Sequence, residues 1–206
     1  MERLRIEGVK AMKFKEIYFN NRAGQTVLSV NEKKGLKLAH IYSIHELNEA
    51  EQANIQDGLW GLEEKTPANV LDESFFRKLH KMLFAQVWKW AGEYRQSEKN
   101  IGIEAWKVPT EIAKLIDDTQ YWLEHKSYPR NELLAHFHHR LVSIHPFPNG
   151  NGRFSRILTN LLCREQDWQE PNWKSSLPPD ERRKVYIEAL RSADLRDYEK
   201  LYNYFL

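Results

Sequence analysis

The chemistry that this 206-residue sequence suggests is concentrated in one short segment, residues 145–156, with the sequence HPFPNGNGRFSR. Two prolines, two glycines and two asparagines in this segment require a tightly turned backbone directly before a helix. Such a turn points successive N–H groups the same way, and the helix N-terminus adds about half a positive charge. The segment therefore predicts an anion site, for which a phosphate group is the natural ligand.

Three side chains extend this prediction. Arg153 and Arg156 stand in the first turn of the expected helix, where each positive charge opposes the helix dipole by roughly 0.3–1 kcal/mol. At a spacing of i and i+3 they could hold two phosphates, or one phosphate from two sides. His145, at the other end of the loop, is expected to have a near-neutral pKa and to take a proton from an attacking hydroxyl. These residue types predict phosphoryl or nucleotidyl transfer, although their spacing alone is equally that of a plain connector between antiparallel helices.

Other nucleotide and metal motifs are missing from the sequence. Neither the Walker pattern G-x-x-x-x-G-K-[ST] nor G-x-G-x-x-G occurs. His136, His138 and His139 precede His145 closely, but no H-E-x-x-H or Cys/His ligand spacing accompanies them. The sequence therefore argues against a P-loop enzyme and against a zinc site.

Apolar residues at helical spacing predict the elements that position the loop. The expected helices begin at Ser43 (ending near Gly58 or Gly61), after Asp72, at Thr110, at Arg130 (ending at Ile144), after Gly152, at Pro178-Pro179 and at Asp194, the last turning Leu195 inward. The loop joins the fourth and fifth of them. Residues 1–40 are expected to form an N-terminal arm or hairpin, residues 41–206 one domain, and the segment from Trp88 to Ile103 a hairpin-like flap.

Composition sets broader limits. The 31 basic and 29 acidic residues differ by only +2, so no overall field favours direct binding of nucleic acid. The single cysteine excludes an intramolecular disulfide and favours a reducing compartment, which we take to be the cytoplasm. No apolar run approaches the ~18 residues of a membrane span, and the first residues lack the apolar stretch of a secretory signal.

The segment resembles the signature of the Fic family, H-x-F-x-[DE]-G-N-G-R-x-x-R, at every specified position but one. Upstream, LHKMLF at 79–84, WAGEYR at 90–95 and NIG at 100–102 are similar to the helix and flap that precede this signature. With EQANI at 51–55, FHHRL at 137–141 and ALRSAD at 189–194, the chain most resembles the bacterial branch called mobile mystery protein B. The resemblance covers roughly residues 40–206. It implies a mainly α Fic fold, a helical bundle around a central helix–loop–helix that carries the motif, with a β-hairpin flap.

The resemblance also implies roles for individual residues. His145 would be the catalytic base, Phe147 would anchor the loop in the core, Arg153 would hold the β and γ phosphates, and Arg156 the γ phosphate. The anion hole would consist of Gly150, Asn151 and Gly152. The flap that docks the target segment by strand-like pairing would use Tyr94, Arg95, Asn100, Ile101 and Gly102.

The implied activity is AMPylation, the transfer of AMP from ATP to a Ser, Thr or Tyr hydroxyl of a target protein. Asn149 departs from the signature, since the family usually has an acid there that binds Mg²⁺ or Mn²⁺. An amide oxygen can coordinate a hard cation but brings no negative charge, so Asn149 is a weak metal ligand. The alternative is a nucleotide-binding Fic-like module whose activity is weak or lost because of Asn149.

Many Fic proteins are inhibited by a glutamate in an [ST]-x-x-x-E-[GN] helix, a pattern that is missing here. Two hypotheses follow. A separate small antitoxin-like protein supplies the glutamate, or Glu51 is a divergent intramolecular version that pairs with Arg156. In a third reading the chain is a regulatory partner of a DNA-binding protein encoded beside it, and the loop is only scaffold.

Overall fold

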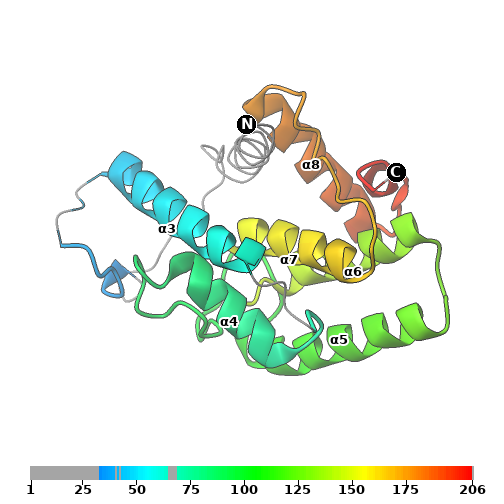
Figure 1. The fold of residues 1–206 in the computed structure, drawn as a ribbon, viewed down its shortest axis with the longest axis horizontal. Helices are drawn as coiled ribbons and strands as arrows, with labels where there is room; N and C mark the ends of the chain where they lie inside the picture. The colour runs from blue at the N-terminus through cyan, green and yellow to red at the C-terminus, as the bar shows by residue number, and fades with distance from the viewer. Residues whose placement is uncertain (1–32, 40, 42, 65–68, 206) are drawn as a thin grey trace.

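The structure is a computed structural model that describes residues 33–39, 41, 43–64 and 69–205. The described part is mainly helical (Figure 1). Its helices, in chain order, are α3 (Ile44–Glu64), α4 (Glu73–Phe84), the short 3-10 helix η1 (Ala105–Lys107), α5 (Val108–Glu124), α6 (Arg130–Ile144), α7 (Asn151–Glu165), α8 (Pro179–Asp194) and α9 (Glu199–Tyr202). The arm or hairpin expected within residues 1–40 lies almost wholly outside the described residues, and its boundary at residue 40 stays a prediction.

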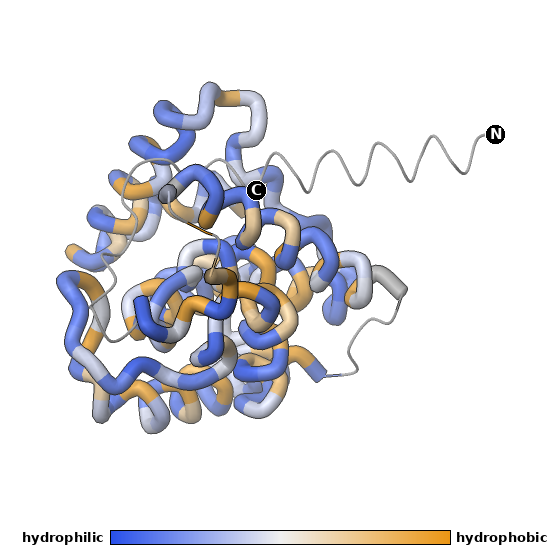
Figure 2. Tube along the Cα trace, turned by 90° about the vertical axis from the view of Figure 1, so that its left-hand side faces the viewer, coloured by the Kyte–Doolittle hydropathy of each residue, from blue (hydrophilic) through white to orange (hydrophobic). Residues whose placement is uncertain are grey.

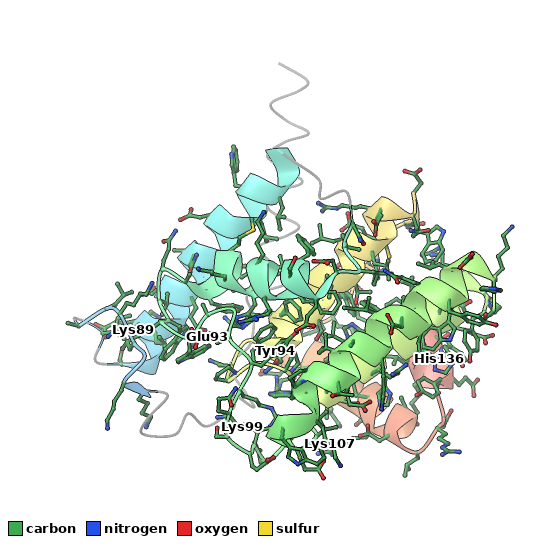
Figure 3. All side chains as sticks on the ribbon, turned by 90° about the horizontal axis from the view of Figure 1, so that it is seen from below. Lys89, Glu93, Tyr94, Lys99, Lys107 and His136 are labelled. Atoms are coloured by element: carbon green, nitrogen blue, oxygen red, sulfur yellow. The ribbon has the colours of Figure 1, made fainter. Side chains whose placement is uncertain are left out.

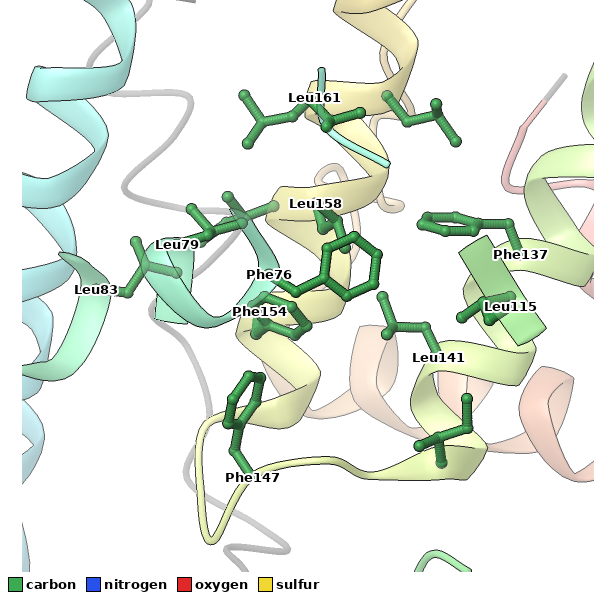
Figure 4. Close-up of a cluster of buried hydrophobic side chains, with 14 of the residues drawn as sticks. Phe76, Leu79, Leu83, Leu115, Phe137, Leu141, Phe147, Phe154, Leu158 and Leu161 are labelled. Carbon is green, nitrogen blue, oxygen red and sulfur yellow. The ribbon is translucent and has the colours of Figure 1, made fainter. Parts of the chain in front are cut away.

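Helix α7 is the centre of the fold, because it is buried almost continuously from Phe154 to Cys163. Figure 4 shows apolar side chains from α4, α5 and α6 around it. The ring of Phe154 packs edge-on against Phe76 of α4, with centroids 5.9 Å apart, and against Phe147 of the preceding loop at 4.9 Å. The predicted anchoring of the loop by Phe147 agrees with these contacts, since this residue is fully buried.

Helix α8 is tied to the centre by a buried polar chain. His138 of α6 is hydrogen-bonded through Nδ1 to the hydroxyl of Thr159 in α7, at 2.9 Å, and through Nε2 to the hydroxyl of Tyr186 in α8, at 2.7 Å. The hydroxyl of Thr159 in turn donates to the carbonyl of Ser155 at 2.8 Å. His138 therefore supports the bundle and is fully buried.

Helix α3 crosses α4 closely. Asn54 donates to the carbonyl of Met82 at 3.1 Å and accepts a hydrogen bond from the backbone N–H of Gln86 at 2.8 Å. A Cβ atom on Gly58 would lie only 2.8 Å from the Met82 carbonyl oxygen, so the two backbones approach as closely as a glycine permits. This crossing fixes where the N-terminal half of α3 lies relative to the loop.

Most helices agree with the sequence predictions. Asp72 caps α4 by accepting the N–H of Phe75 at 2.8 Å, and α6 has the predicted bounds. Along the tube of Figure 2, hydrophobic and hydrophilic colours alternate, as expected for helices with one buried face. None of the helices in the described ranges is long and apolar enough to cross a membrane.

Two predictions are wrong. Leu195 is 84% exposed, because α8 continues to Asp194 and leaves Leu195 at its C-terminal cap, while the next helix starts only at Glu199. The flap at residues 93–104 contains bends and no strand, and the β-bridge found within the described ranges instead joins Leu36 to Trp88.

The two glycines of α3 allow a matched test of the crossing. We expect Gly58→Ala to lower the free energy of unfolding by about 1–3 kcal/mol, because the new methyl overlaps the backbone of Met82. Gly61→Ala should raise it by about 0.5–1 kcal/mol, since a Cβ there meets nothing within 4 Å and alanine favours the helix. Urea unfolding measures both values. Equal effects of the two changes would show that α3 does not pack on α4 in this way.

Candidate active site

The loop between α6 and α7 has a left-handed residue at each end. His145 ends α6 with φ 53° and ψ 60°, a left-handed conformation that residues with a Cβ adopt uncommonly. Gly150 precedes α7 with φ 79°, and a Cβ on it would lie 2.5 Å from the ring of Phe84. Glycine is therefore required at 150, and the backbone reverses sharply enough to bring His145 beside the start of α7.

Side chains on both sides hold the loop in this shape. Asn151 accepts the N–H of Phe147 at 2.8 Å and donates to the carbonyl of Phe147 at 2.7 Å, which closes the turn. His80 of α4 accepts the N–H of Gly92 through Nδ1 at 3.0 Å, so its proton is on Nε2, which donates to the carbonyl of Asn149 at 3.1 Å. The His80 ring also stacks on Phe147, with centroids 3.7 Å apart. The loop is thus fixed before any ligand arrives.

The N-terminus of α7 is open to a ligand. The first backbone N–H groups of a helix have no acceptor within the helix. In this helix they belong to Asn151 and Gly152, and a Cβ placed on Gly152 would meet nothing within 4 Å. This end of α7 therefore offers both free space and a positive dipole to an anion, as the sequence predicted.

The imidazole of His145 is buried and neutral. Burial, together with the positive charges of Arg95 and Lys99, lowers its pKa to about 4, so the prediction of a near-neutral pKa is wrong. Neither ring nitrogen has a hydrogen-bond partner in the described part of the chain. At neutral pH one of these nitrogens carries an unused lone pair, which is what a proton acceptor requires.

Arg95 connects the flap to the loop. Its guanidinium is fully buried and donates to the carbonyls of His145 at 2.7 Å, Ser97 at 3.1 Å and Ile144 at 3.3 Å, and to that of Ile103. These bonds satisfy flap carbonyls that a hairpin would have paired across two strands, which explains why no strand forms there. Arg95 was predicted to dock a target, but its burial gives it a positioning role.

The rest of the flap lies close to His145. Gly102 has φ +107°, and a Cβ on it would come within 2.7 Å of the His145 Cβ. Asn100, Ile101 and Gly102 are exposed, whereas Tyr94 is half-buried. Figure 3 shows Tyr94 and Lys99 along this segment before the start of α5. The exposed part of the flap could therefore contact a second molecule beside the imidazole.

Glu51 reaches the loop from α3. Its carboxylate is almost completely buried and forms an ion pair with Arg153, with Oε2 and Nη2 2.7 Å apart. It also accepts the indole N–H of Trp88 at 2.6 Å and faces the amide nitrogen of Asn149 at 3.4 Å. The sequence hypothesis had Glu51 pairing with Arg156. The structure pairs it with the first arginine of the motif, because α3 passes over the start of α7.

Arg156 points toward α8. Its Nε donates to the carbonyl of Gly152 at 3.0 Å, and its guanidinium lies over the ring of Tyr186, 5.5 Å from the centroid. Both motif arginines, the loop and His145 border one cavity of about 960 Å³, which is also lined by residues of the flap, α3 and α8. This volume is at the upper end of the range for small-molecule sites.

The groups around residue 149 do not fit a metal ion held by the protein. The Asn149 side-chain oxygen accepts the N–H of Gly150 at 2.7 Å, and the nearest carboxylate, that of Glu51, is paired with Arg153. Within the described residues no group of three His, Cys, Asp or Glu side chains could hold a metal ion. The steps proposed below are therefore written without a metal ion held by the protein.

Sequence reasoning missed two residues that hold the site. His80 stands four residues from both Phe76 and Phe84, so a histidine on the buried face of α4 was visible in the pattern. Trp88 gave no comparable signal, because its indole meets Glu51 only through the crossing of α3 and α4.

The chain is similar in sequence to proteins of one known family. Residues 70–163 match the model of the Fic/DOC family. Protein adenylyltransferase Fic of Drosophila persimilis is 34% identical to the chain over 110 residues, which are 52% of this chain and 20% of that protein. The chain thus spans about a fifth of the length of the curated relatives it matches. The bacterial branch named above stays a prediction.

Solved structures share the fold. A Fic domain containing signaling protein from Bacteroides thetaiotaomicron superposes with a TM-score of 0.61 at 20% identity, covering 95% of this chain and 84% of that one. The N-terminal Fic domain of a VirB-translocated Bep effector protein from Bartonella quintana, which has ADP bound, superposes with a TM-score of 0.66 at 19% identity, covering 81% and 86%. The mainly α Fic fold expected from the sequence is thereby confirmed.

The buried histidines predict how stability depends on pH. Burial lowers the pKa of His80 and His138 to about 3 and that of His145 to about 4, whereas an unfolded histidine titrates near 6.5. Between these values the unfolded chain binds more protons, so stability falls as pH falls. We expect the free energy of unfolding in urea to decrease from pH 7 to pH 5, approaching about 1.4 kcal/mol per pH unit for each histidine.

One variant separates this effect from general acid sensitivity. His145→Ala should reduce the slope of stability against pH by the contribution of one histidine, because it removes one of the three buried rings. A free energy of unfolding that stays constant over this pH range would show that the three rings are not buried as described.

Proposed function

We propose that this chain, whose residues 70–163 form a Fic/DOC family domain, transfers AMP from ATP to a Ser, Thr or Tyr hydroxyl of another protein. One observation carries the proposal. The unpaired imidazole of His145 borders the same cavity as the open N-terminus of α7 and the two motif arginines. A proton acceptor beside an anion site is what nucleotidyl transfer to a hydroxyl needs.

The proposed steps use only groups of this chain. The triphosphate binds at the N–H groups of Gly150, Asn151 and Gly152, with Arg153 and Arg156 on its β and γ phosphates. His145 takes the proton of the target hydroxyl, and the hydroxyl oxygen forms a bond to the α phosphorus. The bond from that phosphorus to the bridging oxygen breaks, and pyrophosphate leaves with the negative charge, which the arginines offset.

The lowered pKa of His145 suits this order of events. Burial, together with the positive charges of Arg95 and Lys99, keeps the imidazole neutral and able to accept a proton. A bound triphosphate would supply negative charge near the same ring and raise its pKa toward the value that a general base needs. Nucleotide binding would thus increase the basicity of His145 when the substrate is in place.

The relatives support this choice among phosphate chemistries. The curated proteins that match are named protein adenylyltransferase, and one of the similar solved domains has ADP bound. Because the chain spans only a fifth of those relatives, the activity, the target protein and the docking role of Tyr94, Asn100, Ile101 and Gly102 are all proposals here. Mg²⁺ or Mn²⁺ is proposed only as a component of the assay.

We propose the bacterial cytoplasm as the setting. Cys163 is the single cysteine of the chain, and burial raises the pKa of its thiol to about 12, so it is suited neither to a disulfide nor to redox chemistry. The proposed partner is a target protein, and a small antitoxin or an adjacent DNA-binding protein would be a regulatory one.

The second candidate function is a nucleotide-binding module without transfer activity. Asn149 favours it, because the amide replaces the acid that would hold a metal ion and is itself bonded to the N–H of Gly150. Such a module would be stabilised by ATP, and His145→Ala would change nothing measurable.

Transfer of label distinguishes the two functions. We expect α-³²P-ATP, in Mg²⁺ or Mn²⁺, to label protein, and His145→Ala to reduce the labelling at least about a hundredfold, since general base catalysis typically contributes 10²–10⁴-fold. ATP labelled in the γ phosphate should give no label. Labelling from the γ position would identify a kinase. If even the Asn149→Asp variant gave no labelling, the result would favour the nucleotide-binding module without transfer activity.

Glu51 gives a separate prediction about inhibition. Its carboxylate occupies the guanidinium of Arg153 that the β and γ phosphates would use. We expect Glu51→Gln to raise both ATP affinity and self-labelling by about tenfold, because the amide keeps the contact with Trp88 but weakens the ion pair.

A matched control is available on the same helix. Asp57 of α3 is exposed, and in the described structure it accepts a hydrogen bond only from the side chain of Gln86, at 3.2 Å. Asp57→Asn should therefore change neither the ATP affinity nor the self-labelling. Equal ATP affinity in wild type and Glu51→Gln would reject the intramolecular brake and leave inhibition to a separate protein.

A further inference from the structure

The cavity has a second charged wall that the motif does not explain. Residues 182, 183, 186, 187 and 190 recur on one face of α8, and this face lines the cavity opposite the loop. Arg182 and Arg183 lie at the N-terminal end of that face, and Tyr186, Ile187 and Leu190 lie beside them. The wall therefore combines two cations with an apolar and aromatic surface.

Positive charge exceeds negative charge around the cavity. Its described lining contains Arg153, Arg156, Arg182, Arg183 and Arg191, against Glu49 and Asp194. Asp194 is 2.8 Å from His139, and Glu49 is 3.4 Å from His45. The carboxylate of Glu51 forms its ion pair with Arg153. With five arginines against two carboxylates in its described lining, the cavity has an excess of positive charge.

Of Arg182 and Arg183, Arg183 is the stronger candidate for binding an anion. It is half-buried, and burial lowers the pKa of its guanidinium, although an arginine keeps its charge in proteins. No ion pair to Arg183 occurs among the described residues. A partly desolvated guanidinium that faces a cavity without a counter-ion is stabilised when an anion enters.

Tyr186 separates this cation from the motif. Its ring lies under the guanidinium of Arg156, and the charges of Arg156 and Arg183 both act on its hydroxyl. Tyr186 therefore lies beside Arg156 of the phosphate site and, three residues along α8, beside Arg183.

We propose that Arg183 forms a second anion subsite, which takes a phosphate group on the ribose of a nucleotide. The inference rests on the proposed function, because it assigns the 5′-phosphate chain to α7 and its arginines. The nucleoside body would then lie along Tyr186, between the two phosphate groups. The preferred ligand is thus a nucleotide phosphorylated on its ribose as well as at its 5′ position.

Calorimetric titration of the full chain tests this with defined probes. The probes are AMP, ADP, adenosine 3′,5′-bisphosphate and adenosine 2′,5′-bisphosphate at one ionic strength. We expect at least one bisphosphate to bind about tenfold more tightly than AMP or ADP. ADP is the matched control, since it carries the same number of phosphates, both on the 5′ chain.

Variants on α8 assign the effect to Arg183. Arg183→Gln should abolish the advantage of the bisphosphate and leave ADP binding unchanged, and Arg183→Lys should restore part of it. Lys184→Gln removes the same charge from an exposed neighbour outside the cavity and should change nothing.

The outcomes separate the two proposals. Bisphosphates that bind no better than ADP, or an advantage that survives Arg183→Gln, would overturn the second subsite while leaving the proposed function intact. Failure of ATP, ADP and AMP all to bind would overturn both.

Discussion

The buried guanidinium of Arg95 holds together the backbone on which the site depends. A buried charge is unfavourable unless it is hydrogen-bonded on every side. The guanidinium of Arg95 meets this requirement by donating to carbonyl groups from two segments, the flap and the end of α6. The backbone N–H of Arg95 also donates to the carbonyl of Pro146 at 2.9 Å. The left-handed turn at His145 brings two of these carbonyls within reach. The strained residue and the buried cation thus require each other, and the flap follows from both.

The arginines around the loop differ in how completely carboxylates or carbonyls compensate their charge. Arg153 is paired with Glu51, Arg95 is hydrogen-bonded to carbonyls and lies 3.7 Å from Glu98, and Arg183 forms no ion pair within the described residues. Burial, together with the charges of Arg95 and Lys99, lowers the pKa of His145 to about 4, so its ring is neutral. The site is therefore prepared for an anion, whose negative charge would raise the pKa of this proton acceptor.

Much of this arrangement could be predicted from the sequence, because it depends on local rules. The bounds of α6, the cap at Asp72 and the need for glycine at 150 each follow from a few neighbouring residues. The form of the flap could not be predicted, since a distant guanidinium replaced the expected strand pairing. The partner of Glu51 and the pKa of His145 also depend on how helices cross and on burial, which periodicity does not contain.

The close crossing at Gly58 would act as the pivot if α3 tilted relative to α4. Glu51 is seven residues before Gly58, which places it about 10 Å along the helix from the crossing at 1.5 Å per residue. Tilting α3 by about 10° around that pivot would move the carboxylate by roughly 2 Å, enough to open its 2.7 Å ion pair with Arg153. The crossing itself would hardly move. A displacement of the N-terminal half of α3 would therefore act on the phosphate site while the crossing with α4 stays in place.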